Sequence, residues 1–204
     1  MPFDLTNLFR KSTGKKEIIV VSGLPRSGTS MMMKMLEAAG LEILTDHLRT
    51  ADESNPKGYY EFEQVKKLKE GDFDWLASAQ GKVVKIISAL LQYLPHQYQY
   101  KIIFMRRNMA EILSSQRQML VRDGKQDDNV PDEKLAELYE AHLEKIKAWL
   151  EQQANMSTLY INYNQTLLDP ELNVNQINEF LGGNLNLKAM LQVVDQNLYR
   201  ERRG

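Results

Sequence analysis

A short segment near the start of the chain, residues 17–30, constrains the fold more than any other part. It contains four consecutive β-branched residues, 18–21, which are typical of a strand buried on both faces of a parallel sheet. A turn bounded by Gly23 and Gly28 follows, and residues 31–39 have the composition of a helix. A strand, a glycine-bounded turn and a helix form the layout of a phosphate-binding loop. The backbone N–H groups of the turn and the positive end of the helix dipole both attract an anion.

The loop differs from that of nucleotide hydrolases, Gly-x-x-x-x-Gly-Lys-Ser/Thr, because Thr29 stands where that pattern has lysine. A cation lies inside the loop instead, at Arg26. The stretch resembles the 5′-phosphosulfate-binding loop of the sulfotransferase family. By that resemblance, the residues that bind the phosphosulfate end of a donor are Pro25, Arg26, Ser27, Gly28, Thr29 and Ser30.

A second anion-binding element is predicted where a strand over residues 100–105 ends. Arg107 follows this strand, Asn108 comes next, and Ser115 lies eight residues after Arg107. Arginine beside a helix N-terminus suits bidentate contact with a phosphate. The stretch resembles the 3′-phosphate motif of the same family, an arginine followed by Asn or Asp with a serine eight residues on. Arg106 and Ser114 have the same spacing, but Asn108 favours the Arg107 register.

The resemblance extends over residues 17–204 and is strongest to bacterial members of the family. It implies that the donor is 3′-phosphoadenosine 5′-phosphosulfate, that the acceptor is a hydroxyl or amine of a small molecule, and that no metal is required. It also implies roles for individual residues. Arg26 would stabilise the leaving phosphate and the sulfuryl oxygens, while Arg107 and Ser115 would hold the 3′-phosphate.

The general base is where the chain departs from the family pattern. One branch of the family has a Lys-Thr-His run after its third strand, and here Lys85 is kept while Ile87 takes the place of the histidine. Lys85 could face the sulfuryl group. Other branches use a glutamate, and Glu61, which follows a predicted strand next to the loop, is our candidate; Glu63 and His47 are the alternatives.

Two other functions compete with this prediction. An ATP-dependent small-molecule kinase on the same fold would need Mg²⁺ held by an acid at a strand end, and only Asp46 is suitably placed in the sequence. A non-catalytic nucleotide-binding module would account for the missing histidine. Magnesium-dependent ATP turnover would favour the first, and tight nucleotide binding without transfer would favour the second.

Composition narrows the classes of partner. The formal net charge of -1 gives no reason to expect nucleic acid or an acidic membrane, and the absence of cysteine excludes disulfides, thiolate metal sites and a cysteine nucleophile. No apolar run approaches the ~18 residues that suggest a membrane span. Residues 1–16 lack the apolar core of a signal peptide, so the sequence predicts a cytoplasmic protein.

Alternating elements predict an α/β fold of the P-loop type, with a doubly wound, mainly parallel five-stranded sheet flanked by helices. The expected strands are 18–21, 41–44, 82–87, 100–105 and 158–162, and the longest helices are 64–79, 109–120 and 132–153. We expect one domain over residues 1–204, with an N-terminal arm at 1–16 and a lid loop at 121–131. Three aromatic residues around Glu61 could line an acceptor pocket or could simply pack: Tyr59, Tyr60 and Phe62.

Overall fold

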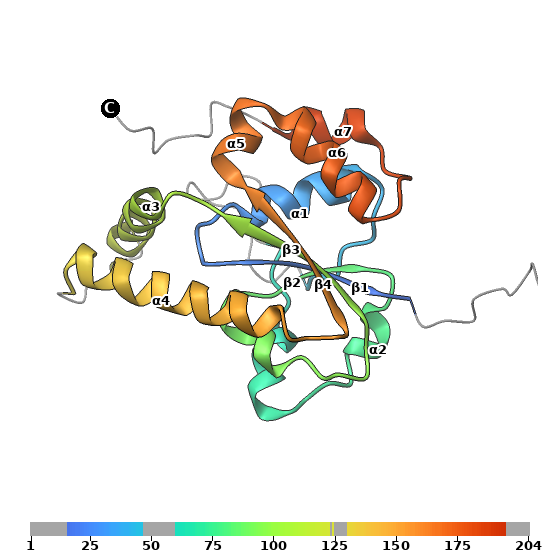
Figure 1. Cartoon of the computed structure of the whole chain (residues 1–204), viewed down its shortest axis with the longest axis horizontal. Helices are drawn as coiled ribbons and strands as arrows, with labels where there is room; N and C mark the ends of the chain where they lie inside the picture. The colour runs from blue at the N-terminus through green and yellow to red at the C-terminus, as the bar shows by residue number, and fades with distance from the viewer. Residues whose placement is uncertain (1–15, 47–59, 123, 125–129, 195–204) are drawn as a thin grey trace, which may run out of the picture.

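The computed structural model describes residues 16–46, 60–122, 124 and 130–194 (Figure 1). Several sequence predictions fall outside these residues: the N-terminal arm apart from Lys16, His47, Tyr59 and most of the predicted lid. The two phosphate-binding elements, Lys85 and Glu61 all lie within the described part of the chain.

The centre of the fold is a sheet of four parallel strands in the order β2-β1-β3-β4. The strands are β1 (Ile18–Gly23), β2 (Val83–Lys85), β3 (Tyr100–Arg106) and β4 (Met156–Asn162). Because all four are parallel, their carboxyl ends share one edge, where the loop after β1 and the residues after β3 are neighbours. The predicted α/β class and the parallel sheet are therefore confirmed.

The prediction of a fifth strand at residues 41–44 is wrong for the described chain. Only Ile43 pairs with β2, through a single parallel bridge to Val83. The segment then leaves the sheet, because the Thr45 hydroxyl and the Asp46 N–H both donate to the carbonyl of Glu61, at 2.8 and 3.3 Å. These hydrogen bonds replace the ladder that a longer strand would need.

Helices cover both faces of the sheet (Figure 1). One face carries α1 (Thr29–Ala38), α5 (Tyr163–Leu168), α6 (Pro170–Phe180) and α7 (Leu187–Val193). The other carries the 3₁₀ helices η1 (Glu63–Glu70) and η2 (Ser88–Tyr93) with α2 (Leu76–Ala79) and α4 (Asp132–Leu150). Helix α3 (Met109–Arg122) packs on α4 beyond the edge of the sheet.

Two helix predictions need correction. The single helix predicted over residues 64–79 is split into η1 and α2, because Gly71 ends η1 in a left-handed conformation with φ of 80°. Helix α5 was not predicted, although its start has a recognisable signal: the side chain of Asn162 caps it by accepting from the N–H of Gln165 at 3.0 Å.

The alternation of the strands divides the apolar core into two clusters. In β3, Phe104 belongs to the cluster under η2 and α4, while Met105 belongs to the cluster under α1 and α6. Successive side chains of a strand point to opposite faces, so Arg106, the last residue of β3, is on the same face as Phe104. Arg107 is the first residue after the strand. None of the helices in the described residues is long and apolar enough to cross a membrane.

Candidate active site

The loop after β1 is bent by close approaches that only glycine allows. A Cβ on Gly28 would lie 2.3 Å from Cδ2 of Tyr163, and one on Gly23 would lie 2.7 Å from the Met105 carbonyl oxygen. Both glycines have positive φ, 98° and 146°, and so does Arg26, with φ of 70°. A non-glycine residue in this region of φ stores backbone strain, and such strain is concentrated at binding and catalytic sites.

The loop leads into the N-terminus of α1. The first hydrogen bond of the helix runs from the Met32 N–H to the Gly28 carbonyl at 3.2 Å, and no side chain caps this end. The N–H of Ser27 donates back to the Leu24 carbonyl at 3.2 Å. The N–H groups at the N-terminal end of α1 therefore begin with that of Gly28. The hydroxyl of Ser27 is buried, with no hydrogen-bond partner among the described residues.

The two predicted phosphate elements meet through direct hydrogen bonds. Arg26 donates from Nε to Oγ of Ser115 at 3.0 Å, and Arg107 donates from Nη1 to the backbone carbonyl of Arg26 at 3.0 Å. The loop after β1 and the start of α3 are therefore joined at a single place. Arg107 and Ser115 are linked through Arg26, and not by a hydrogen bond of their own.

Arg107 has partners that sequence reasoning missed. Its Nε donates to Oε2 of Glu111 at 3.0 Å, and its guanidinium lies 4.7 Å from the ring centre of Tyr163. Both side chains of the ion pair are buried, with 8% of Arg107 and 6% of Glu111 exposed. The i,i+4 spacing of Arg107 and Glu111 could have indicated the pair. Asn164, which donates to both Glu111 oxygens at 2.9 and 3.0 Å, left no signal in the sequence.

Burial and charge both act on Tyr163, which lies among these groups. Burial raises the pKa of the Tyr163 phenol, with Glu111 adding to the effect and Arg107 and Arg26 opposing it. The Tyr163 phenol is therefore neutral at pH 7. Its face is available to the Arg107 guanidinium as a cation–π surface.

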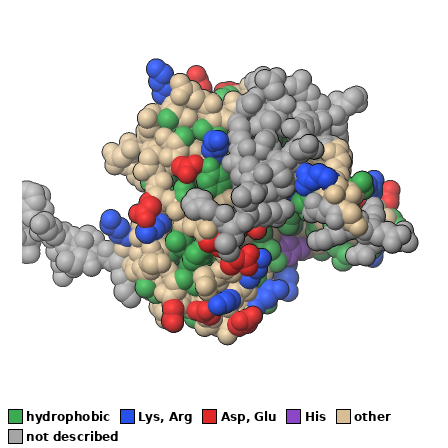
Figure 2. Space-filling model, turned by 180° about the vertical axis from the view of Figure 1, so that it is seen from behind, with side chains coloured by type: hydrophobic (Ala, Val, Ile, Leu, Met, Phe, Trp, Pro, Cys, Tyr) green, Lys and Arg blue, Asp and Glu red, His purple; other side chains and the backbone are tan. Residues whose placement is uncertain are grey.

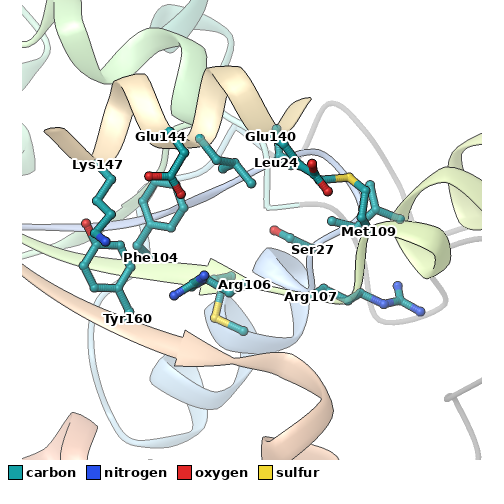
Figure 3. A pocket seen from close by; sticks show the side chains of 13 residues that line it. Leu24, Ser27, Phe104, Arg106, Arg107, Met109, Glu140, Glu144, Lys147 and Tyr160 are labelled. Carbon is teal, nitrogen blue, oxygen red and sulfur yellow. The ribbon is translucent and has the colours of Figure 1, made fainter. Parts of the chain in front are cut away.

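The neighbouring arginines leave the end of β3 in opposite directions (Figure 3). Arg106 points toward the side of Phe104 and Tyr160, whereas the guanidinium of Arg107 points away from them. Arg107 hydrogen-bonds to the loop, through the backbone carbonyl of Arg26. The choice of Arg107 over Arg106 for the 3′-phosphate stays a prediction.

Arg106 and Arg107 both line a pocket of about 230 Å³ between the end of the sheet and α4 (Figure 3). Leu24 and Ser27 of the loop form part of its lining. The wall from α4 carries Glu140, Leu143, Glu144 and Lys147, and the sheet contributes Phe104 and Tyr160. The pocket combines apolar walls with charges of both signs, directly beside the loop.

Glu61 and Lys85 lie on the β2 side of β1, whereas Arg107 lies on the β3 side. Lys85 ends β2 and is the register partner of Val21 in β1. Glu61 follows the segment that bridges to β2, and its carbonyl accepts the Thr45 and Asp46 hydrogen bonds described above. Both side chains are half-buried at the carboxyl edge of the sheet.

Other acidic and aromatic residues near Glu61 have structural partners. Asp46 accepts from the backbone N–H of Glu63 at 2.6 Å, and Glu63 pairs with Lys66. Within the described residues, no group of three His, Asp or Glu side chains is placed to hold a metal ion. Tyr60 donates to Glu37 at 2.6 Å, and Phe62 packs edge-on against Trp75. A role for these aromatic residues in an acceptor pocket stays a prediction.

The sequence matches the family model described as "Sulfotransferase domain" over residues 16–203. This chain belongs to the sulfotransferase domain family. A sequence search of curated proteins finds no match. The matched residues include both predicted phosphate elements, Lys85 and Glu61.

Solved structures share the sulfotransferase fold with this chain. Sulfotransferase STF1 from Mycobacterium tuberculosis H37Rv superposes with a TM-score of 0.58 at 17% identity, covering 89% of this chain and 71% of that one. The sulfotransferase domain from the curacin biosynthetic pathway superposes with a TM-score of 0.51 at 15% identity, covering 88% of this chain and 78% of that one. At such identities the likeness establishes the fold alone.

In this sulfotransferase, Ile87 occupies the position that matches the family histidine in sequence. Ile87 is 41% exposed, and the next residue, Ser88, is buried. The Ser88 Oγ lies 2.9 Å from Nε2 of His142 on α4. Burial lowers the pKa of His142 below its ordinary value, and Lys145 adds to this, so the imidazole is neutral at pH 7.

The charged surface of the enzyme is mixed in sign. On the face seen in Figure 2, Lys and Arg side chains alternate with Asp and Glu over the described residues. A strong anion site must therefore be built locally from a few buried cations. Arg26 and Arg107 provide such a group at the loop.

Proposed function

We propose that this enzyme transfers a sulfuryl group from 3′-phosphoadenosine 5′-phosphosulfate to a hydroxyl or amine of a small molecule. The observation that carries the proposal is the contact of the two phosphate elements, Arg107 to the Arg26 carbonyl and Arg26 to Ser115. A donor with phosphates on both its 5′ and 3′ positions needs two anion sites in one crevice. The hydrogen bonds between the loop and α3 supply that proximity.

The 5′-phosphate would lie at the loop, held by the amides from Gly28 onward and by the hydroxyls of Thr29 and Ser30. The uncapped N-terminus of α1 supports this assignment, because its first N–H groups and its dipole favour an anion. Pro25 is exposed at the turn of the loop, where its fixed φ shapes the approach to Arg26. The buried Ser27 hydroxyl is a further donor next to this position.

The 3′-phosphate would be bound by Arg107 and Ser115. With Nε bonded to Glu111 and one N–H of Nη1 bonded to the Arg26 carbonyl, Arg107 keeps three N–H groups that hydrogen-bond no described residue. The Ser115 hydroxyl accepts from Arg26 and so retains its own proton to donate. Together they form a fork that suits a phosphate dianion.

For the transfer step, Arg26 and Lys85 would hold the negative charge that develops on the sulfuryl oxygens and on the departing bisphosphate. Glu61 would take the proton of the acceptor hydroxyl as the acceptor oxygen bonds to sulfur. Support for these roles is positional: Lys85 ends the strand next to β1, and Glu61 lies beside the bridge to that strand. The acceptor would then sit on the β2 side of the loop.

The test compares two neighbouring arginines. We expect Arg107→Ala to weaken the binding of adenosine 3′,5′-bisphosphate by about 10- to 100-fold, the value of hydrogen bonds to a charged group, and to leave adenosine 5′-monophosphate unaffected. Arg106→Ala, which removes the arginine on the opposite side of β3, should leave both affinities within about twofold. Titration calorimetry measures both, after thermal melts confirm that each variant is folded.

Two outcomes would contradict the proposal. One is a wild-type enzyme that binds ATP and the bisphosphate equally well, because the 3′-phosphate would then contribute nothing. The other is a larger loss from Arg106→Ala than from Arg107→Ala. That result would move the 3′-phosphate to the pocket beside α4.

A further inference from the structure

Arg107 is a buried cation whose orientation is set from two directions. Its Nε donates to Glu111 on α3 and its Nη1 donates to the loop carbonyl of Arg26, both at 3.0 Å. The face of the guanidinium lies 4.7 Å from the Tyr163 ring centre on α5. A planar group held along one edge, at one corner and over one face has a single orientation. Its remaining N–H groups therefore point in a fixed direction.

Glu111 is itself held in place by Asn164. The Asn164 Nδ2 donates to both carboxylate oxygens at 2.9 and 3.0 Å, and its Oδ1 accepts from the backbone N–H of Asn108 at 3.2 Å. A backbone N–H can only donate, so the oxygen end of the Asn164 amide must face Asn108 and its NH₂ end must face Glu111. A buried carboxylate with these partners is satisfied and rigid.

We propose that Glu111 and Asn164 are positioning residues for the 3′-phosphate of the donor, acting through Arg107. This inference rests on the proposed function, in which Arg107 binds that phosphate. Asn164 aligns Glu111, Glu111 holds the Nε edge of Arg107, and the remaining Nη N–H groups are thereby presented to the ligand. Residue 164 thus contributes to a site whose recognisable motif ends at Ser115.

Glu111 has two opposite effects on a bound anion, and they can be separated. Its negative charge beside Arg107 opposes anion binding, whereas its hydrogen bond orients the guanidinium and favours bidentate contact. We infer that orientation dominates. A free arginine side chain must lose rotamer freedom when it binds, and here that freedom is already lost in the unbound enzyme.

The experiment measures the affinity of adenosine 3′,5′-bisphosphate by titration calorimetry, with adenosine 5′-monophosphate as the ligand that lacks the 3′-phosphate. We expect Glu111→Ala and Asn164→Ala to weaken bisphosphate binding by about tenfold and about threefold, the size of one or part of one hydrogen bond. Glu111→Gln, which keeps an acceptor for Nε, should stay within about threefold of wild type. Monophosphate affinity should not change in any of these variants.

Controls distinguish positioning from other roles. Glu137→Ala removes an exposed glutamate of α4 that pairs with Lys134, and should change neither affinity. If Glu111→Ala and Glu111→Gln both tighten bisphosphate binding, the charge dominates and the inference is overturned. An equal weakening of both nucleotides in Glu111→Ala also overturns it, since the defect would then lie in the site as a whole.

A double-mutant cycle tests whether Glu111 acts through Arg107. In an Arg107→Ala background, Glu111→Ala should have no further effect on bisphosphate affinity, and removing both charges also avoids leaving one buried and unpaired. The same loss in both backgrounds would refute the positioning role alone. Bisphosphate affinity unchanged by Arg107→Ala would instead remove the 3′-phosphate site of the proposed function, and this inference with it.

Discussion

The two sides of the central strand β1 are built from different kinds of contact. On the β3 side, the side chains of Arg107, Glu111 and Asn164 are joined to each other and to the loop by hydrogen bonds of 2.9 to 3.0 Å. On the β2 side, Glu61 and Lys85 are half-buried, and Glu61 is located through its backbone carbonyl. The first region is built from buried side-chain hydrogen bonds, and in the second the main chain of Glu61 also takes part.

On the β3 side, the contacts proposed to support donor binding also stabilise the fold. Removing one partner of a buried ion pair leaves an uncompensated charge, so changes on the β3 side should alter stability as well as donor affinity. An isosteric change of a half-buried side chain costs the fold less than a change in a buried ion pair. Four predictions test this contrast.

The largest effect is expected on the β2 side, from Glu61→Gln. If Glu61 accepts the acceptor proton, kcat should fall by about 100-fold, the lower end of the range for general bases, with little change in melting temperature or donor affinity. Steady-state kinetics with an acceptor identified from a panel of alcohols and amines measures this. Glu63→Gln, a nearby acid already paired with Lys66, is the matched control, and full turnover in Glu61→Gln would reject the assignment.

The next effect is on stability at the loop, where Gly28→Ala should cost about 3 kcal/mol from strained φ together with the close approach to Tyr163. The control is Gly40→Ala, because Gly40 has a similar φ of 95° but nothing within 4 Å of the added Cβ. That change should cost only about 1 kcal/mol. Urea denaturation of both variants separates the two contributions, and equal costs would show that the tyrosine yields.

A smaller effect should appear in the pH dependence of stability. The pKa of His142 is lowered by burial in the folded enzyme, so below its ordinary value of 6.5 the unfolded chain binds the proton more readily. Stability should therefore fall as pH decreases from about 6.5 toward 5, and fall less in His142→Gln. Denaturant midpoints across this range test it. Identical slopes in the two proteins would show that His142 does not contribute, and the exposed His96 serves as the control position.

The smallest effect is expected from filling the pocket beside α4. Leu143→Phe adds bulk to its wall, and if the acceptor binds on the β2 side, the acceptor KM and the donor affinity should both stay within about twofold. A tenfold rise in acceptor KM with unchanged donor affinity would instead assign the acceptor to this pocket. Glu140 and Glu144 would then replace Glu61 as the candidate bases.

Local pattern was sufficient to predict the strand, loop and helix around Arg26 and the arginine after β3, while their binding of phosphate stays a prediction. The glycine-bounded loop and the Arg107 register depend on the residues of one strand end and one helix start, and such short-range constraints are written in consecutive positions. The predicted strand at 41–44 is wrong for the complementary reason. Its composition suits a strand, but hydrogen bonds from Thr45 and Asp46 to Glu61 turn the chain away after one bridge.

Consecutive residues were enough to predict the parallel α/β class, the loop with its internal arginine and the second cation at the end of β3, because each depends on neighbours a few residues apart. The contacts of these groups follow from the three-dimensional fold. Asn164 meets Glu111 across 53 positions, and Arg26 meets Ser115 across 89. Such contacts arise because parallel strands bring the starts of their following helices to one edge, and no periodicity in the chain encodes them.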